Sequence, residues 1–344
     1  MATITKEQIR EMNDPVIERK PVGGFFRNMM FNREKNHVTD LIDIDLWKGQ
    51  RRVAPYCKVS DKATPFDRIK GTTGAFKIPN IKLKRTIAPG DLLDRGVGEA
   101  VYSSKSPMQR GNEVMAQDLI DLDDAIARAE EIQCAQAVID GKVVIKGTDI
   151  DAEVDMQRDA TLFLLPAALP STGWTTANDI LADLRFMRRR SFAVSGRSPS
   201  TVIMGSAAAE VFLKNIQIAD MLDNRRLDAG AVTLPNGVKL ENIIFYGNVG
   251  GFDFYEYNEL FDDPNNNNTV TNVMATDKVV LASMGSRCVA HYAPIMDMKS
   301  LMPERRFSKW VDLEDPSVRE LIMQSRPLMV TEEPDAFVTA DVIV

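Results

Sequence analysis

Residue types that commonly carry catalysis are sparse in this sequence. The two histidines, His37 and His291, fit no nucleophile or metal-ligand spacing, and the three cysteines, Cys57, Cys134 and Cys288, are far apart and odd in number. Neither a structural zinc site nor a disulfide framework is therefore expected. The sequence also contains no Gly-x-Ser-x-Gly nucleophile elbow. These observations predict a protein that is not an enzyme and that uses no cofactor or metal.

Three short stretches resemble binding motifs, but each is incomplete or has a simpler interpretation. Residues 71–74 (GTTG) are not followed by the Gly-Lys-Ser/Thr of a phosphate-binding loop, and we interpret them as a turn. Asp40, Asp43 and Asp45 lack the glycine and the distal glutamate of a calcium loop, which favours outer positions of a strand. Residues 188–190 are arginines that could contact phosphate, although a solvated or subunit-facing helix end is the simpler interpretation.

The charge of the chain is unevenly distributed. The net charge is −7, yet residues 48–85 hold eleven basic residues against two acidic ones, a net charge of +9, so the remainder carries −16. The basic residues are Lys48, Arg51, Arg52, Lys58, Lys62, Arg68, Lys70, Lys77, Lys82, Lys84 and Arg85. This asymmetry predicts an interaction arm, whose partner is either nucleic acid or the acidic remainder of an identical subunit.

The elements that would position this basic segment are extended. Residues 1–47 are typical of an N-terminal arm that ends in a short strand at 38–46, where apolar residues cluster. Residues 48–95 predict a β-hairpin with strands at 53–59 and 76–83, because turn residues lie between two apolar stretches. A hairpin with so little apolar content is marginal by itself and needs a surface to lie on.

A long helix gives the strongest local signal. Ser106 and Gln109 form a capping box with proline between them, and Gly141 is a C-terminal cap, so the sequence predicts a helix over about 107–140. At 1.5 Å per residue this helix is roughly 50 Å long. Its acidic residues are expected on the outer face; they are Asp118, Asp121, Asp123, Asp124, Glu130 and Glu131.

The rest of the chain alternates short strands and helices and indicates the α+β class. Strands are expected at 142–146, 152–156, 161–165 and 201–204, and helices at about 175–192 and 207–213. A hairpin of 240–246 with 251–257, a polar loop at 262–269 and paired strands at 278–283 and 287–292 should follow. The tail should form short strands with turns at 315–316 and 333–335. No apolar run is long enough to span a membrane, and no secretory signal is expected.

Several stretches, in order and at similar spacing, resemble the phage major capsid protein E family of lambda-type phages. They are Phe25-Phe26-Arg27 through Glu34-Lys35 to Val38, residues 129–135 with Gly141-Lys142, Glu153-Val154-Asp155-Met156 with Arg158, Lys309-Trp310-Val311, Asp315-Pro316, Gln324-Ser325, Pro327-Leu328-Met329, Pro334-Asp335 and Phe337-Val338. The C-terminal set is the most specific part of the resemblance.

The resemblance implies the Hong-Kong-97-type capsid fold. Its parts would be an N-terminal arm (1–47), an E-loop hairpin (48–95), a peripheral domain with the spine helix (96–171), an axial domain (172–293) and the C-terminal part of the peripheral domain (294–344). The implied function is a major capsid protein that assembles through hexamers and pentamers into an icosahedral head around double-stranded DNA. The implied location is the virion head, with the host cytoplasm during assembly.

Partners also follow from the resemblance. We expect the protein to assemble with copies of itself, a separate scaffolding protein, a portal and, in reinforced shells, a decoration protein, while packaged DNA is contacted only weakly and no membrane is involved. Some capsid proteins of this fold join a loop lysine to an asparagine of a neighbour. No asparagine follows Asn272, so we expect no such covalent network.

The basic hairpin is expected to lie on the acidic surface of a neighbouring subunit. The candidate interface residues are Arg51, Arg52, Lys58, Lys62, Arg68, Lys70 and Lys77 on one subunit and Asp118, Asp121, Asp124 and Glu131 on the other. Two alternatives remain open at this point. One is an encapsulin-like or gene-transfer-particle shell, and the other is a nucleic-acid-binding protein that uses residues 48–85, although aromatic residues are scarce there.

Overall fold

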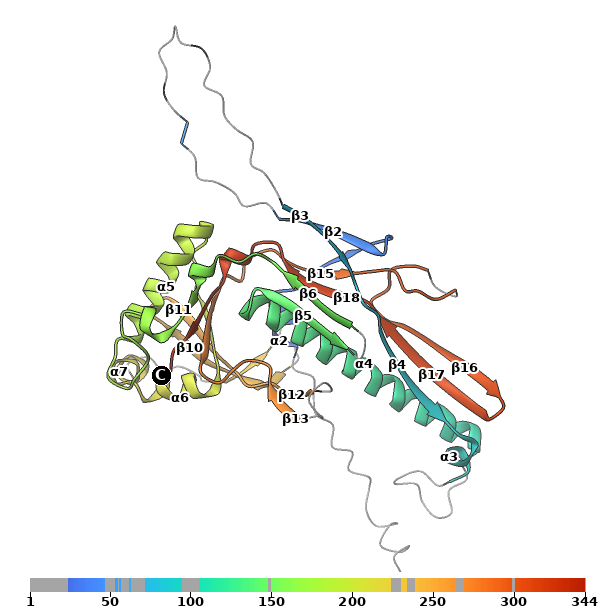
Figure 1. Ribbon diagram of the computed structural model, residues 1–344. Helices are drawn as coiled ribbons and strands as arrows, with labels where there is room; N and C mark the ends of the chain where they lie inside the picture. Colours follow the sequence, from blue (N-terminus) through green and yellow to red (C-terminus); the bar gives the residue numbers. More distant parts are fainter. Residues whose placement is uncertain are drawn as a thin grey trace, which may run out of the picture.

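The computed structural model describes residues 24–46, 53–54, 56, 62, 72–94, 105–147, 150–223, 230–233, 239–263, 269–298 and 301–343. A long helix, α4 (Pro107–Ile139), crosses the middle of the molecule, with a helix-covered seven-stranded sheet at one end and a three-stranded sheet alongside the other (Figure 1). The remaining elements are arranged around this helix.

Helix α4 begins and ends where its sequence predicts. Gln109 donates its backbone N–H to the Ser106 hydroxyl at 3.3 Å, and the Gln109 side chain accepts from the Ser106 N–H at 2.9 Å. These two bonds satisfy donors that the first turn of a helix leaves free. At the other end Gly141 adopts a φ of +67°, a conformation that glycine adopts without steric cost. The predicted spine helix is therefore confirmed.

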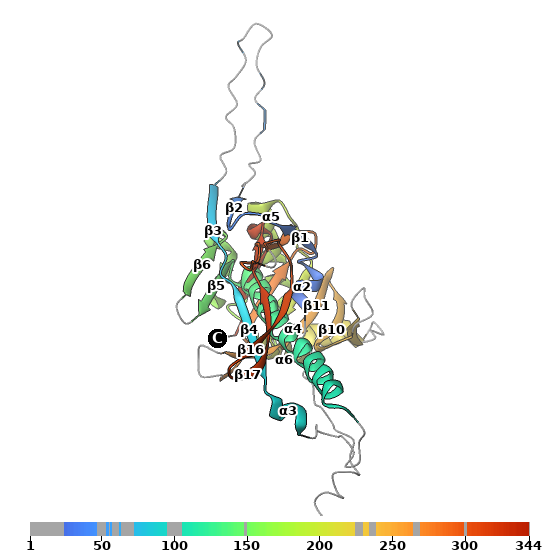
Figure 2. The same ribbon diagram turned by 90° about the vertical axis from the view of Figure 1, so that its right-hand side faces the viewer.

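A three-stranded sheet lies on the N-terminal half of α4. It consists of β16 (Phe307–Glu314), β17 (Ser317–Ser325) and β4 (Ile81–Ile87), with β17 in the middle. In the sequence, β4 is followed by the short helix α3 (Pro89–Leu93). Leu122 and Ile126 of the helix pack against Leu321 and Met323 of β17. Figure 2 shows this sheet beside the helix, with α3 beyond the end of β4.

The base of the predicted hairpin is built from other strands than expected. Strand β3 (Thr72–Lys77) pairs with β2 (Leu41–Leu46) in an antiparallel register from Leu41 opposite Lys77 to Leu46 opposite Thr72. The prediction that 76–83 forms one return strand is wrong, because residues 78–80 interrupt it and β4 pairs with β17 instead. Alternate apolar residues of β4, Ile81 and Leu83, join the core under α4. The predicted strand at 53–59 falls mostly outside the described residues; residues 53, 54 and 56 lie in no strand.

The seven-stranded sheet has the order β7-β19-β14-β8-β11-β10-β9. Its strands are β7 (Phe163–Leu164), β8 (Thr201–Met204), β9 (Gly230–Thr233), β10 (Lys239–Val249), β11 (Phe252–Tyr257), β14 (Lys278–Ala282) and β19 (Val338–Asp341). Val202 and Met204 of β8 face the core that contains residues of α5 (Ile180–Ser195) and α6 (Ser206–Lys214). Ile203 between them faces the opposite way, into a second core, the central core, which includes the C-terminal half of α4. Helix α7 (Ile216–Asp223) follows α6. Burial on both faces explains the unbroken apolar runs of β8 and β14.

The predicted strands of this region are confirmed with some changes. The 201–204 strand, the 207–213 helix and the 240–257 hairpin are present as β8, α6 and β10–β11. The helix expected from about 175 starts at Ile180, because the Asp179 carboxylate caps the amide of Ala182. In place of a 161–165 strand there is a 3-10 turn (Ala160–Leu162) and the short β7. The polar 262–269 stretch joins β12 (Leu260–Asp263) to β13 (Thr269–Asn272).

The prediction that 278–283 and 287–292 pair with each other is wrong. Strand β14 pairs with β8 and β19, whereas β15 (Cys288–Tyr292) pairs with β1 (Arg33–Asn36) and β18 (Pro327–Thr331) in a separate sheet. The seven-stranded sheet also takes β7 and β19 from outside the 172–293 unit. The chain thus leaves the helix-covered sheet at β15 and returns to it with β19.

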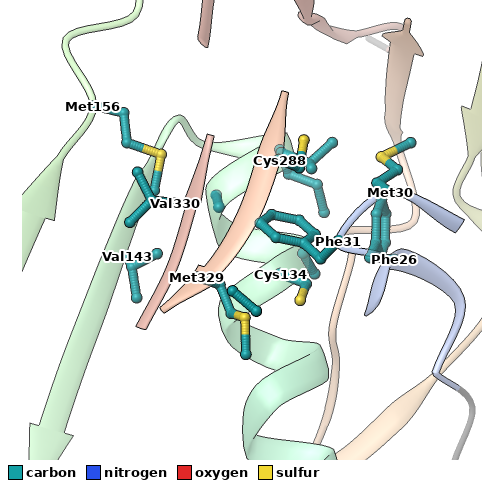
Figure 3. Packing of buried hydrophobic residues seen from close by; sticks show 14 of the residues in the cluster. Phe26, Met30, Phe31, Cys134, Val143, Met156, Cys288, Met329 and Val330 are labelled. Atoms are coloured by element: carbon teal, nitrogen blue, oxygen red, sulfur yellow. The ribbon is translucent and has the colours of Figure 1, made fainter. Parts of the chain in front are cut away.

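The central core joins both ends of the chain to the C-terminal half of α4. Phe26 lies in helix α2 (Phe25–Met29), and Phe31 follows this helix. Both rings pack with Cys134 of α4, Cys288 of β15 and Met329 of β18 (Figure 3). The hairpin β5–β6 (Lys142–Gly147 and Ile150–Asp155) adds Val143 on the other side of β18. The 3-10 turn Pro334–Ala336 then leads into β19.

Candidate assembly interface

Asp118 and Asp121, predicted on the outer face of α4, form ion pairs inside the subunit. The Arg85 guanidinium of β4 lies 2.8 Å from Asp118 Oδ1 and 3.2 Å from Asp121 Oδ2. Asp118 is buried. These pairs fix the three-stranded sheet to the spine helix, and they use one of the eleven cations of the basic segment.

Glu130 is also buried and joins the C-terminal part of the chain to the helix. Its carboxylate lies 2.6 Å from Arg306 Nη1 and 3.4 Å from Arg305 Nη2, and it accepts a hydrogen bond from the Tyr292 hydroxyl at 3.2 Å. A carboxylate removed from water needs such partners, because an unpaired buried charge is costly. Asp123, two helical turns earlier, binds the same Arg306.

Glu131 holds the N-terminal part of the chain. Its carboxylate accepts the backbone N–H groups of Phe26 at 2.9 Å and Arg27 at 3.0 Å, and the Tyr257 hydroxyl at 3.2 Å. Burial raises the pKa of Glu131 to about 7, although all three hydrogen bonds oppose that shift. The side chain of Arg27 binds Glu34 and the carbonyl of Phe31, which closes the segment on itself.

The prediction that the acidic residues of α4 face outward is therefore wrong for Asp118, Glu130 and Glu131. A sequence signal for two of them was present. Asp118, Leu122, Ile126 and Glu130 recur every four residues, so both carboxylates lie on the apolar stripe of the helix. Asp124 is half-exposed and forms no ion pair with any residue that the structure describes.

The basic partners of the predicted interface are mostly outside the described residues. Arg51, Arg52, Lys58, Arg68 and Lys70 belong to this group, as does the side chain of Lys77 in β3. Lys62 is described and exposed. At the end of the segment, Lys84 lies 2.8 Å from Glu320 of β17. The interface role of these residues stays a prediction.

The tip of the β16–β17 hairpin is acidic. Asp312, Glu314 and Asp315 are exposed there, and the Asp315–Pro316 peptide bond is cis. Asp312 pairs with Arg319, whereas Glu314 and Asp315 form no ion pair within the described part of the chain. This tip presents carboxylates that are free to meet a cationic partner.

Exposed apolar side chains gather next to the same sheet. Met296, Met298, Leu301 and Met302 lie in the loop between β15 and β16, and Trp310 of β16 is 59% exposed. The loop is held by a hydrogen bond from the Ile295 N–H to the Met302 carbonyl at 3.2 Å and by an ion pair between Asp297 and Lys309. Exposed apolar groups of this size commonly mark contact surfaces.

The other short motifs have structural positions. Asp40 pairs with the buried Arg326, and no group of three or more His, Cys, Asp or Glu within the described ranges could hold a metal ion. Residues 72–74 belong to β3, so the interpretation of 71–74 as a simple turn is wrong. Arg188 donates to the carbonyls of Pro199 and Gly251 and lies 3.9 Å from the centre of the Phe252 ring. No helix in the described part of the chain is long and apolar enough to cross a membrane.

Comparison with known proteins identifies the family. Residues 9–342 match the family model described as phage major capsid protein E. The chain is 25% identical to the major capsid protein of Enterobacteria phage phi80 and 23% identical to that of Escherichia phage lambda, over 98% of this chain and 99% of each relative.

The fold agrees with this assignment. The crystal structure of a prophage capsid protein of E. coli CFT073 superposes with a TM-score of 0.70 at 17% identity, covering 94% of this chain and 93% of that one. The predicted Hong-Kong-97-type capsid fold is thus confirmed, as is the predicted capsid function over the alternatives of a different shell or a nucleic-acid-binding protein. The chain belongs to the phage major capsid protein E family and is a self-assembling subunit of the icosahedral phage head.

Proposed function

We propose that the basic segment of one subunit lies on the acidic surface of its neighbour and that this contact drives closure of the head. The observation that carries the proposal is the charge of the segment itself. Lys84 and Arg85 pair inside the subunit, and residues 48–82 contain nine basic residues against two acidic ones, a net charge of +7. Weak charge contacts, each about 0 to 1 kcal/mol when exposed, add up over many subunits.

The acceptor surface differs from the one expected from sequence. Asp118, Asp121 and Glu131 already have partners within the chain, and we assign them to holding the subunit together. Asp124 keeps its place in the proposal. Glu314 and Asp315 at the β16–β17 tip join it, because they are exposed and form no ion pair with described residues.

Charge reversal tests the proposal. The triple variant Arg51→Glu, Arg52→Glu, Lys58→Glu should remain a folded subunit by circular dichroism and should fail to form particles in electron micrographs. A matched control reverses Lys146, Arg185 and Lys214, three exposed basic residues elsewhere, to glutamate. If the first triple variant forms normal particles, the proposal is wrong. If both triple variants fail, net charge and not this segment controls assembly.

A second variant distinguishes the acceptor. Glu314→Lys with Asp315→Lys should weaken assembly alone and restore it in part when combined with the triple reversal. Assembly of wild-type subunits should also be inhibited as salt rises, because exposed ion pairs are screened over a Debye length of about 8 Å at physiological ionic strength.

We further infer the setting in which the subunit works. Hexamers and pentamers form in the host cytoplasm with a separate scaffolding protein and a portal. Non-covalent contacts or a decoration protein reinforce the shell, packaged DNA touches it only weakly, and the chain has no catalytic role. The resemblance to lambda-type relatives and the acidic body of the protein support this inference. A ladder of covalent multimers on denaturing gels of mature particles would contradict the expected absence of cross-linking.

A further inference from the structure

The two histidines of the chain lie against each other although 254 positions separate them. His37 Nε2 and His291 Nδ1 are 2.7 Å apart, and the rings stack with centroids 5.0 Å apart and planes inclined by 20°. Two nitrogens at this distance accommodate one hydrogen, which one ring donates and the other accepts. The contact therefore requires that at least one of the two facing nitrogens be unprotonated.

The surroundings of His291 disfavour an added proton. The residue is 5% exposed, and its second ring nitrogen, Nε2, is buried without a hydrogen-bond partner among the described residues. Burial, followed by the charges of His37 and Lys35, lowers the pKa of His291 to about 4, against the opposing effect of Glu332. Burial and Lys35 also lower the pKa of His37. A proton on Nε2 of His291 has no hydrogen-bond acceptor among the described residues.

The charged groups around the pair come from the strands on either side. Lys35 of β1 forms an ion pair with Glu332, which follows β18. Beyond His37, Asp40 is paired with Arg326, which connects β17 and β18. Both carboxylates already have a cationic partner, and the effect of Glu332 on His291 is outweighed by burial and by the charges of His37 and Lys35.

The pair sits at the end of a short edge strand. Strand β1 has four residues, all exposed, and lies at the edge of its sheet. It pairs in parallel with β15 from Arg33 opposite Val289 to Asn36 opposite Tyr292, and the His37 N–H then donates to the Tyr292 carbonyl at 2.9 Å. The ring contact extends this pairing by one residue at the point where the chain turns toward β2.

We propose that the His37–His291 pair is an acid-sensitive latch that holds β1 on β15 while the rings are neutral and releases it when both are protonated. On double protonation a hydrogen occupies each facing nitrogen, so the N–H···N bond is lost and two cations face each other. The Phe26–Glu131 anchor lies elsewhere on the segment, so release is confined to β1 and the turn after it. The inference concerns the single subunit and does not depend on the proposed charge contact.

The direction of the effect follows from proton linkage. Since His291 has a lowered pKa in the folded subunit, the released strand binds more protons than the latched one between about pH 6.5 and pH 4. The latch is fully effective above pH 6.5 and is lost as the pH falls through this window.

Selective isotope labelling of histidine gives a direct test, because the full-length chain contributes only two imidazole signals. In the unassembled wild-type protein the His291 ring should remain neutral at pH 6, and the titration curves of the two rings should be coupled. Amide exchange of residues 33–37, expressed as protection relative to the unstructured rate at each pH, should fall roughly ten-fold or more between pH 7.5 and pH 4.5. A His291 imidazole that titrates near pH 6.5 in the folded protein would overturn the proposal.

Two variants separate the latch from other acid effects. The double variant His37→Gln, His291→Gln has no imidazole to protonate, so its protection at 33–37 should change less than about two-fold over the same pH range. Lys35→Gln removes the neighbouring ion pair but keeps both rings, and it should retain the wild-type pH response. If the double variant loses protection as the wild type does, carboxylates such as Glu34 or Glu332 control the strand and the latch is refuted. The wild-type titration stands by itself if the double variant does not fold.

Discussion

Glu131 accepts the backbone N–H of Phe26 at 2.9 Å, across 105 positions of sequence. The neighbouring Glu130 binds Arg306, which is 176 positions away in the other direction. Two consecutive residues of the spine helix therefore fasten the start of the described chain and a segment of its C-terminal part. The spine is a junction inside the subunit before it is a surface for other subunits.

Replacing Glu131 should change the pH dependence of stability. Its pKa is raised to about 7 by burial, so the folded subunit binds more protons than the unfolded chain between about pH 4.5 and pH 7. The free energy of unfolding should therefore fall by about 1 kcal/mol from this group between pH 6.5 and 8.5. Glu131→Gln should remove that fall and, since one amide N–H loses its acceptor, cost about 1 to 3 kcal/mol at pH 6.5. Urea unfolding at both pH values measures this effect. The prediction is contradicted if the free energy of unfolding falls equally between the two pH values in Glu131→Gln and in the wild type.

Removal of Arg306 should leave the buried carboxylate of Glu130 without its nearest cation. Arg306→Met leaves Glu130, which is 1% exposed at its side chain, with the more distant Arg305 as its remaining cation. Breaking a buried pair in this way costs about 3 to 5 kcal/mol. The control is Arg319→Met, which removes the exposed pair with Asp312 and should leave the denaturation midpoint nearly unchanged. Similar midpoints for the two variants would show that the Glu130 site is not a structural anchor.

The end of the spine helix should depend on Gly141. Its φ is +67°, and a Cβ there would lie 3.0 Å from Arg158 Cβ, so Gly141→Ala should cost about 1 to 2 kcal/mol or more. Gly90→Ala is the matched control, because a Cβ at Gly90 meets nothing within 4 Å. Thermal unfolding should separate the two variants by several degrees, whereas equal midpoints would refute the argument.

The beginning of the helix offers a smaller effect. Ser106→Ala removes the hydroxyl that accepts the Gln109 N–H and should cost about 0.5 to 2 kcal/mol. Ser198→Ala, at an exposed position outside helices and strands, is the comparison that should have no effect. Calorimetry of both proteins gives the difference, and a Ser106→Ala protein as stable as the wild type would mean that the first turn contributes little.

Local signals account for what the sequence predicts well. The capping box at Ser106 and the glycine at position 141 depend on bonds within one turn of the chain, so the bounds of α4 follow directly from them. The strands β8 and β14 are recognised by their continuous apolar runs for the same reason.

Pairing between distant strands is where prediction from sequence was wrong. Strand β15 is as apolar as β14, and no residue in either strand specifies which sheet it joins. The partner of β4 is β17, more than 230 positions away, and packing of Ile81 and Leu83 on the spine favours it over the expected hairpin. The four-residue spacing places Asp118 on the apolar stripe, but its pairing with Arg85 depends on where β4 comes to lie.

The position of β19 in the seven-stranded sheet has a consequence for synthesis. This strand lies between β7 and β14, which are formed from residues 163–164 and 278–282, and it comes from residues 338–341. While residues 338–341 are still inside the ribosome, β14 has an open edge and β7 has no partner strand. Because chains emerge from the N-terminus onward, the sheet is completed only after these residues have emerged. A partly made subunit therefore cannot present finished surfaces to its neighbours, which separates the time of synthesis from the time of assembly.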